Sequence, residues 1–263
     1  MELPLFPLHT VLCPGVALPL HIFEPRYRAL VKHCLDDGSP FGIVLIRDGR
    51  EVGGGPTSIA TVGTVAEIRE AGKFSDGRYE LLVVGVRRFR IESVIVGREP
   101  YLIGQVEEVE ELVGDMALAR DLTDRVTQRF VRYLALLQPV DGEDADEIDV
   151  QVELELEDDA PEPGLGSTTG DLVDDESESA DERDRLDRVA RNVAIPDDPT
   201  ILSYLLSGII QVDQPRRQDL LEAATTEARL RELIRLIDRE VVLLERRLRN
   251  FSVDPRTAAL RRN

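Results

Sequence analysis

The sequence contains no tryptophan and only two lysines, Lys32 and Lys73, among its 263 residues. This scarcity of lysine excludes two classes of catalytic site. A nucleotide-binding P-loop ends in Gly-Lys-Ser/Thr, whereas Lys73 precedes Phe74 and Lys32 follows Val31. A Ser–Lys nucleophile needs an oxyanion hole, and neither lysine has the Gly-rich surroundings that would supply one. The sequence also has no Gly-x-Ser-x-Gly elbow of a serine hydrolase. We therefore expect no ATPase or peptidase activity and predict that the chain is not an enzyme.

Cysteine and histidine are also rare, and all five of these residues lie in the first 34 positions. Two cysteines cannot form a disulfide framework, and a chain of this length does not need one, so we expect a reducing, cytoplasmic location. The sequence has no Cys-x-x-Cys or His-x-x-x-His pair of the kind that zinc sites commonly use. We expect no metal site and no cofactor. The five residues are His9, Cys13, His21, His33 and Cys34.

Residues 3–23 contain no charged side chain, and a segment of this length is long enough to cross a bilayer. Prolines interrupt the segment, however, and prolines at this density destroy a continuous helix. No positively charged stretch or cleavage site marks it as a signal peptide. We expect neither a membrane span nor a signal peptide. The interrupting prolines are Pro4, Pro7, Pro14 and Pro19.

The net charge of the chain is −19, and one segment accounts for it. Residues 141–187 contain 21 acidic side chains and two arginines, while the rest of the chain is neutral. Few large apolar residues follow Leu156, so we predict a disordered acidic linker over 139–184. A decoy for a basic partner and an intramolecular cover are functional alternatives. The alternating residues 150–156 leave an edge strand as a structural alternative.

Residues 1–112 have the pattern of short strands separated by Gly-rich turns, with one helix among them. Apolar runs of strand length recur, for example over 41–46 and 59–68. A helix is predicted to begin at Pro25, because proline suits the first helical turn, and to end at Gly38, which serves as a C-terminal cap. These features predict a small β-barrel or paired sheets.

The remaining ordered regions are predicted to be helical. Apolar residues at steps of three and four over 113–138 indicate a connecting amphipathic helix capped by Asp115. A helical subdomain follows over 185–252, and seven of its apolar residues form a heptad seam. The seam fits packing within a bundle of this chain or a homodimer through 230–251. The fold class is therefore α+β, with a β subdomain followed by a helical bundle. The seam consists of Leu230, Ile234, Ile237, Val241, Leu244, Leu248 and Phe251.

A cluster of three arginines around Phe89, at positions 87–90, is a motif that RNA-binding surfaces use. The alternation of Phe89 and Ile91 with charged residues instead indicates a half-buried strand whose arginines lie on the outward face. Because the rest of the chain carries no excess of positive charge, we do not expect nucleic acid or anionic membranes as partners.

Three motifs carry a family resemblance: Leu-Pro-Leu-Phe-Pro-Leu at 3–8, Pro-Leu-His-Ile-Phe-Glu-Pro-Arg-Tyr-Arg at 19–28, and Gly-Val-Arg-Arg-Phe-Arg-Ile at 85–91. With 11–15, 41–45, 62–68, 76–78 and 100–102, they resemble the N-terminal, substrate-binding domain of the ATP-dependent Lon proteases. Residues 198–206 and 220–245 are similar to the helical half of that domain. The resemblance covers about 1–138 and 195–250.

The resemblance implies a PUA-like β subdomain over 1–112 and the capture of unfolded or degron-bearing polypeptides. In the full protease, ATPase and Ser–Lys peptidase modules follow this domain, whereas the present sequence ends at Asn263 without a P-loop. The expectation is a standalone, non-catalytic polypeptide-binding module that acts as an adaptor or substrate sorter. A protease or a chaperone is the expected partner.

The expected binding surface lies where the apolar strand meets the start of the first helix. Each of its residues, taken singly, is also explained as part of the core. PUA-like folds serve RNA recognition too, so RNA binding and a structural or oligomerisation role remain the alternative functions. The sequence contains no cluster of polar residues that would indicate a small-molecule site. The predicted site residues are Leu18, Ile22, Phe23, Glu24, Arg26 and Tyr27.

Overall fold

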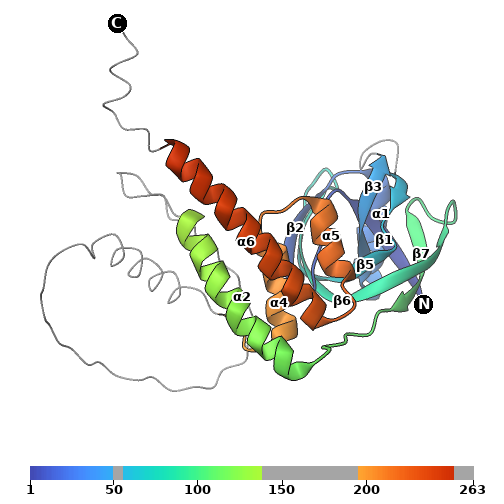
Figure 1. Cartoon of the computed structure of the whole chain (residues 1–263). Coiled ribbons are helices and arrows are strands. Elements are labelled where there is room, and N and C mark those ends of the chain that lie inside the picture. The colour runs from blue at the N-terminus through green and yellow to red at the C-terminus, as the bar shows by residue number, and fades with distance from the viewer. Residues whose placement is uncertain (50–55, 138–194, 252–263) are drawn as a thin grey trace, which may run out of the picture. The chain divides into compact units, whose positions relative to one another are not determined.

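The computed structural model describes residues 1–49, 56–137 and 195–251 (Figure 1). The chain divides into two compact units, Met1–Thr127 with Ile195–Ile237, and Gln128–Ala194 with Asp238–Asn263. Two long helices, α2 (Met116–Leu137) and α6 (Thr226–Phe251), continue from the first unit into the second. The strands and the shorter helices described below all belong to the first unit.

Seven strands and three shorter helices are described in the first unit. The strands are β1 (Glu2–Leu8), β2 (Ala17–Ile22), β3 (Phe41–Gly49), β4 (Pro56–Ile59), β5 (Val62–Lys73), β6 (Tyr79–Ile95) and β7 (Leu102–Glu108). The shorter helices are α1 (Pro25–Asp37), α4 (Pro199–Ile209) and α5 (Gln214–Glu222). This combination of one mixed sheet with a later helical region confirms the predicted α+β class.

Strand β1 closes the sheet into a small barrel. The strands β1, β7, β6, β5 and β3 pair in that order as antiparallel neighbours, and β1 also pairs in parallel with β3. Two strands lie off this ring: β2 pairs with the first part of β6, and β4 pairs with β3. The long strand β6 therefore has β2 on one side and β5 on the other where it begins.

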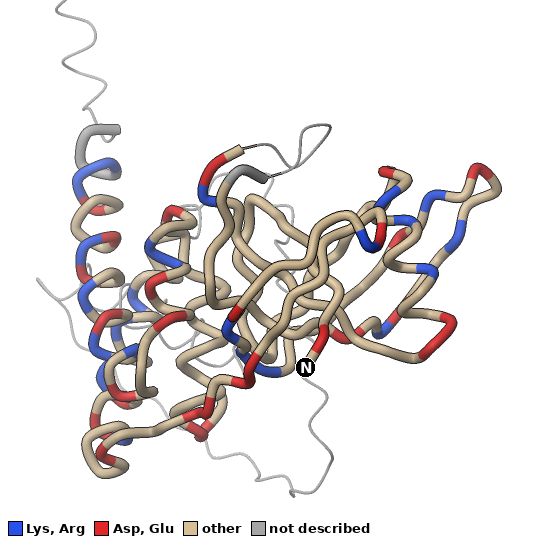
Figure 2. The backbone as a smooth tube through the Cα atoms, turned by 90° about the vertical axis from the view of Figure 1, so that its right-hand side faces the viewer, with Lys and Arg blue, Asp and Glu red and all other residues tan. Residues whose placement is uncertain are grey.

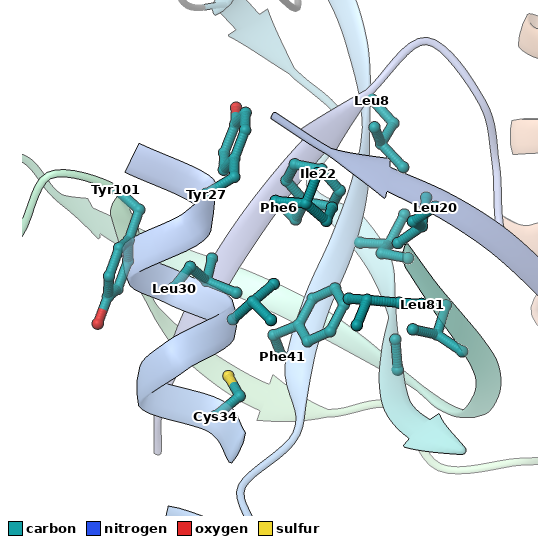
Figure 3. Packing of buried hydrophobic residues seen from close by; sticks show 14 of the residues in the cluster. Phe6, Leu8, Leu20, Ile22, Tyr27, Leu30, Cys34, Phe41, Leu81 and Tyr101 are labelled. Carbon is teal, nitrogen blue, oxygen red and sulfur yellow. The ribbon is translucent and has the colours of Figure 1, made fainter. Parts of the chain in front are cut away.

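The core lies on both faces of β1, which explains why this strand is apolar at nearly every position. Leu3 and Leu5 pack with Phe89 in one cluster, while Phe6 belongs to a second cluster that includes α1. In Figure 3, Leu30 points from α1 toward the strands of this second cluster. Charged residues of both signs alternate along the helices, whereas the central strands carry few of them (Figure 2).

The helix ends fall where the capping residues predict them. Helix α1 begins at Pro25 and ends before Gly38, whose φ of 63° is left-handed. The Asp115 carboxylate accepts hydrogen bonds from two backbone N–H groups in the first turn of α2. Asp198 caps α4 in the same way. These ends are set by local chemistry, which is why the sequence reveals them.

In the second unit, ion pairs join the distal halves of α2 and α6. Arg129 Nε lies 2.9 Å from Asp238 Oδ1, and Arg132 Nη2 lies 2.7 Å from Glu245 Oε1. Along α6, the first four seam residues are buried within the chain. These contacts agree with the bundle explanation of the seam, and the homodimer through 230–251 stays a prediction.

Some predictions concern residues that the structure does not describe. The acidic linker over 139–184 and its edge-strand alternative over 150–156 lie outside the described residues. The four-part division of the chain at 112, 138 and 184 also stays a prediction. Among the described helices, none has both the length and the apolar character that crossing a membrane requires.

Candidate functional site

Three elements meet where β2 leads into α1. Strand β2 ends at Ile22, and α1 begins at Pro25. Ile22 pairs with Tyr79, the first residue of β6, and Tyr79 also pairs with Lys73, the last residue of β5. The turn over 74–78, which joins β5 to β6, therefore lies beside the strand–helix junction.

Two exposed phenylalanines on this surface contact the same histidine. The ring centroid of His21 lies 6.2 Å from that of Phe23 and 6.3 Å from that of Phe74. Phe23 is 48% exposed and Phe74 is 42% exposed. The guanidinium carbon of Arg78 lies 5.5 Å from the Phe74 ring, and Arg78 Nη1 lies 3.3 Å from His21 Nε2. We call His21, Phe23, Phe74 and Arg78 the aromatic patch.

The structure separates the six predicted site residues into exposed and buried ones. Phe23 is exposed, so explaining it as a core residue is wrong. Ile22 and Tyr27 are 2% and 4% exposed and belong to the main core cluster, where Figure 3 shows Ile22 next to Phe6. For Ile22 and Tyr27 the core explanation holds. Their role at the junction is to fix the backbone that presents Phe23.

The three remaining predicted residues are engaged within the chain. Leu18 is partly buried against the main core cluster. Glu24 and Arg26 form an ion pair with 2.9 Å between Arg26 Nε and Glu24 Oε2. The Arg26 guanidinium carbon also lies 4.4 Å from the centre of the Tyr27 ring. The contacts of Glu24 and Arg26 therefore lie within the N-terminal cap and first turn of α1.

An open hollow of about 570 Å³ lies between α1 and the 74–78 turn. Arg28, Lys32 and Lys73 line it together with one acid, Asp76, and we call it the basic hollow. The backbone N–H and the Nε of Arg78 donate hydrogen bonds to Asp76, at 3.1 and 2.7 Å. These bonds, the backbone one first, lower the pKa of the Asp76 carboxyl. Asp76 therefore remains a paired carboxylate.

Gly77 allows this turn and this hollow to coexist. Its φ of 82° is left-handed, a conformation that glycine adopts without steric cost. A Cβ atom at this position would also collide with the guanidinium group of Arg28, which lies across the turn. Asp-Gly is a dipeptide that commonly forms turns, but the contact with Arg28 is visible only in the structure.

A buried network of charged residues joins the strands to the helices of the first unit. Arg229 is fully buried and donates hydrogen bonds to the Leu220 carbonyl, to Ser203 Oγ and to the Tyr204 hydroxyl, at 3.0, 2.9 and 2.8 Å. Its Nη2 lies 3.2 Å from Glu111 Oε1, and the Tyr204 hydroxyl donates to the other oxygen of Glu111. Burial raises the pKa of Tyr204, so this hydroxyl keeps its proton.

Arg88 completes the buried network and corrects a prediction. The sequence pattern places Arg88 on the outward face of its strand, but this side chain is 2% exposed. It donates to the carbonyls of Leu221 and Ala223, at 2.9 and 2.8 Å, and its Nη2 lies 3.0 Å from Glu111 Oε2. These carbonyls end α5, where helical carbonyls lack intrahelical partners. The prediction is wrong because α5 covers this part of β6, which local alternation does not reveal.

The histidines and cysteines do not gather into a metal site. Cys13 and Cys34 are buried free thiols, and burial raises the pKa of each to about 11. Within the described ranges, no group of three or more His, Cys, Asp or Glu side chains is arranged to hold a metal ion. Of the five residues, His21 alone belongs to the aromatic patch.

Comparisons with known proteins agree with the sequence resemblance. A family model described as the ATP-dependent protease La (LON) substrate-binding domain matches residues 2–239. Lon protease 2 of Myxococcus xanthus is 36% identical over 110 residues, which are 41% of this chain and 13% of that protein. Lon protease 1 of Hydrogenovibrio crunogenus is 23% identical over 238 residues, which are 89% of this chain and 23% of that protein. The chain thus spans less than a quarter of the length of these curated relatives.

Two solved structures have a similar fold. A Lon N-terminal domain protein from Xanthomonas campestris superposes with a TM-score of 0.51 at 22% identity, over 89% of this chain and 97% of that one. The N-terminal domain of the Mycobacterium avium complex Lon protease superposes with a TM-score of 0.57 at 18% identity, over 90% of this chain and 98% of that one. At these identities the likeness concerns the fold.

Proposed function

The chain belongs to the family of the Lon protease substrate-binding domain, and from this premise we propose that it is a module that binds unfolded or degron-bearing polypeptides. It carries out no ATPase or peptidase chemistry and acts as an adaptor or substrate sorter for a protease or a chaperone. Family membership supports the binding of polypeptide substrates, and the adaptor role is what the proposal adds. It works in the reducing cytoplasm, where the two buried thiols stay free.

The aromatic patch is the observation that carries this proposal. Unfolded chains expose apolar side chains, and each Å² of apolar surface removed from water contributes about 25 cal/mol. Phe23 and Phe74 each leave nearly half of their surface exposed. The patch is also held in place, because Ile22 and Tyr27 are core residues beside it. An aromatic ring on an anchored backbone loses less conformational freedom on binding than one on an unanchored segment.

Side-chain capture explains binding here better than strand addition does. Among the described strands, β2 pairs only with β6, which leaves its other edge open. Proline within a sheet is confined to edge strands with its missing N–H on the solvent side. Pro19 therefore removes a donor from the open edge of β2 and weakens the pairing of an added strand. The aromatic patch has no such restriction.

Polypeptide binding is tested with the full chain and a fluorescently labelled model protein that is kept unfolded by reduction and carboxymethylation. We expect saturable binding in an anisotropy titration. Phe23→Ala and Phe74→Ala should each raise Kd about fivefold, because each removes roughly 1 kcal/mol of apolar burial. Thermal melting should stay unchanged in both variants, since neither ring belongs to a core cluster.

Ile201→Ala is the matched control, because Ile201 is 45% exposed on α4 and lies outside the patch. Its Kd should equal that of the unsubstituted chain. Binding that is unaffected by both phenylalanine substitutions would contradict the proposal. A single-stranded RNA is titrated in parallel at low and moderate salt, because phosphate-driven binding weakens steeply with salt and apolar binding does not. Steeply salt-dependent RNA binding without polypeptide binding would favour the alternative function.

A further inference from the structure

The basic hollow lies next to the aromatic patch and has a separate chemistry. We propose that it binds the carboxylates of Asp or Glu residues in the captured polypeptide, close to the apolar residue that the patch holds. This inference rests on the proposed function and adds a sequence preference to it. The preferred segment combines a large apolar side chain with acidic neighbours.

The hollow collects both lysines of the chain. Arg28 and Lys32 are four residues apart on α1 and so share one face of the helix. Lys73 comes from the end of β5, on the other wall. Three cations against one carboxylate give the lining a positive balance.

Two of these three cations form no close ion pair with a carboxylate of the described residues, although the charge of Arg28 also helps to lower the pKa of the Asp76 carboxyl. Lys32 forms an ion pair with Asp36 on its own helix. Neither Arg28 nor Lys73 forms such a pair with any residue that the structure describes. The Lys73 ammonium lies 5.5 Å from the centre of the Tyr79 ring, a contact that leaves its hydrogen-bond donors available. The hollow therefore offers unsatisfied donors to an anion.

Asp76, the acid in the lining, does not neutralise the cations of the hollow. Asp76 accepts two hydrogen bonds from Arg78, a residue of the aromatic patch, and is thereby held toward the turn. The Asp76 carboxylate stays charged, but the adjacent guanidinium of Arg78 offsets that charge, so the hollow keeps a positive balance. Gly77 keeps the turn small enough for the Arg28 guanidinium to lie across it.

The hollow and the patch are close enough to act on one bound segment. Phe74 and Arg78 of the patch and Lys73 and Gly77 of the hollow belong to the same five-residue turn and its flanks. An extended chain advances about 3.3 Å per residue, so a segment held at Phe74 brings residues only a few positions away to the hollow. Charge complementarity then selects acidic residues at those positions. Because the hollow is open to solvent, the preference is modest and salt-dependent.

The experiment compares three fluorescent peptides of equal length that share one central phenylalanine and differ in their flanks, which are Glu, Gln or Lys. We expect the full chain to bind the Glu-flanked peptide about fivefold to tenfold more tightly than the Gln-flanked one at low salt. The Arg28→Gln, Lys73→Gln double variant should lose this preference and keep its affinity for the Gln-flanked peptide. The single variant Lys73→Glu should shift the preference toward the Lys-flanked peptide.

Arg120→Gln is the control, because Arg120 is an exposed cation on α2, away from the hollow. It should retain the full preference for Glu. Equal binding of all three peptides, or a preference that survives both hollow variants, would overturn the inference while leaving the proposed function standing. If no peptide binds, whatever its flanks, both fail together. Single-stranded RNA is also tested as a phosphate-rich competitor. If it displaces the Glu-flanked peptide while supplying less total negative charge than that peptide does, the assignment to carboxylates would also be overturned.

Discussion

The basic hollow and the buried network both contain several cations, but they use them in opposite ways. In the buried network, Arg88 and Arg229 share one carboxylate, Glu111, and direct their other donors at the Tyr204 hydroxyl, at Ser203 Oγ and at carbonyls near the end of α5. In the hollow, Arg28 and Lys73 have no ion pair with any described residue. The chain itself satisfies most donors of the first arrangement, with Arg88 Nε as a buried exception, whereas the second arrangement is open to a ligand.

This difference separates structural charges from functional ones. Removing a buried charge from water costs several kcal/mol unless hydrogen bonds and an opposite charge compensate for it. Burial accordingly lowers the pKa of Arg229, which reflects the cost of desolvating its charge, while Tyr204 and Glu111 oppose that lowering. An exposed cation has no such cost, so it needs no partner in order to remain. Cations that stay exposed and unpaired in a hollow are therefore the better candidates for binding.

The largest expected effect comes from removing a buried charge. Arg229→Met should lower the free energy of unfolding by about 3 to 5 kcal/mol, because Glu111 and the carbonyl of Leu220 lose a buried partner. Urea denaturation of the full chain measures this change. Arg120→Met, on an exposed part of α2, should change stability by less than about 0.5 kcal/mol.

A similar loss in both variants would remove the distinction between the two classes of cation. So would an Arg229→Met variant whose stability matches that of the unsubstituted chain, since the methionine would then replace the arginine by apolar packing alone. In contrast, the Gln substitutions in the hollow should leave stability unchanged and alter only the affinity for acidic peptides.

The second comparison concerns two neighbouring residues at the strand–helix junction. Ile22→Ala should lower the free energy of unfolding by about 2 to 5 kcal/mol, because Ile22 fills the main core cluster. Phe23→Ala should change it by less than about 0.5 kcal/mol, because its ring is half exposed. The same urea titrations measure both values. If Phe23→Ala destabilises the chain as much as Ile22→Ala does, Phe23 is a core residue. The aromatic patch would then lack Phe23 as a binding ring.

The sequence predicts the elements whose causes are local. Pro25 and Gly38 bound α1 through backbone preferences, and Asp115 and Asp198 cap their helices through hydrogen bonds to adjacent residues. Strand β1, by contrast, is not singled out in the sequence prediction, which uses Pro4 and Pro7 only as evidence against a continuous helix, and proline within a sheet is confined to positions that lack a partner on its nitrogen side. In the structure, Pro4 lies in the part of β1 that pairs with β7, and Pro7 lies in the part that pairs with β3. Each proline thus has a partner strand on one side only.

The candidate site shows the same division between local and distant causes. The motif around Phe23 directs attention to the strand–helix junction, and Phe23 is exposed there. Phe74, Arg28 and Lys73 are absent from the sequence prediction, because their proximity depends on the pairing of β2 with β6. The burial of Arg88 depends on α5, which follows more than a hundred residues later. Long-range pairing leaves no mark in a local pattern of residues.

The smallest expected effect concerns local opening of the buried network and of the strand–helix junction. The reactivity of one cysteine in each region reports on it. Cys13 packs with Tyr204 and Leu221 beside the buried network, while Cys34 packs with Leu30 in the cluster that includes α1. Burial raises the pKa of both thiols to about 11, so at pH 8 both are protonated and alkylate slowly. A thiol whose folded pKa is raised stabilises the fold fully below its unfolded pKa, about 8.5. That contribution is lost as the pH rises toward 11.

At pH 8, Arg229→Met should accelerate the alkylation of Cys13 by iodoacetamide. The factor by which it accelerates Cys13 should be about threefold larger than the factor for Cys34. The reason is that this variant removes contacts of the helices that cover Cys13, whereas the packing of Cys34 under α1 does not involve Arg229. Peptide mass spectrometry of the full chain, after timed labelling, gives both rates in one sample. Equal acceleration of the two thiols would mean that the buried network stabilises the whole first unit cooperatively. In that case the junction that carries the aromatic patch opens together with the strand–helix interface, and the two regions differ in chemistry but not in stability.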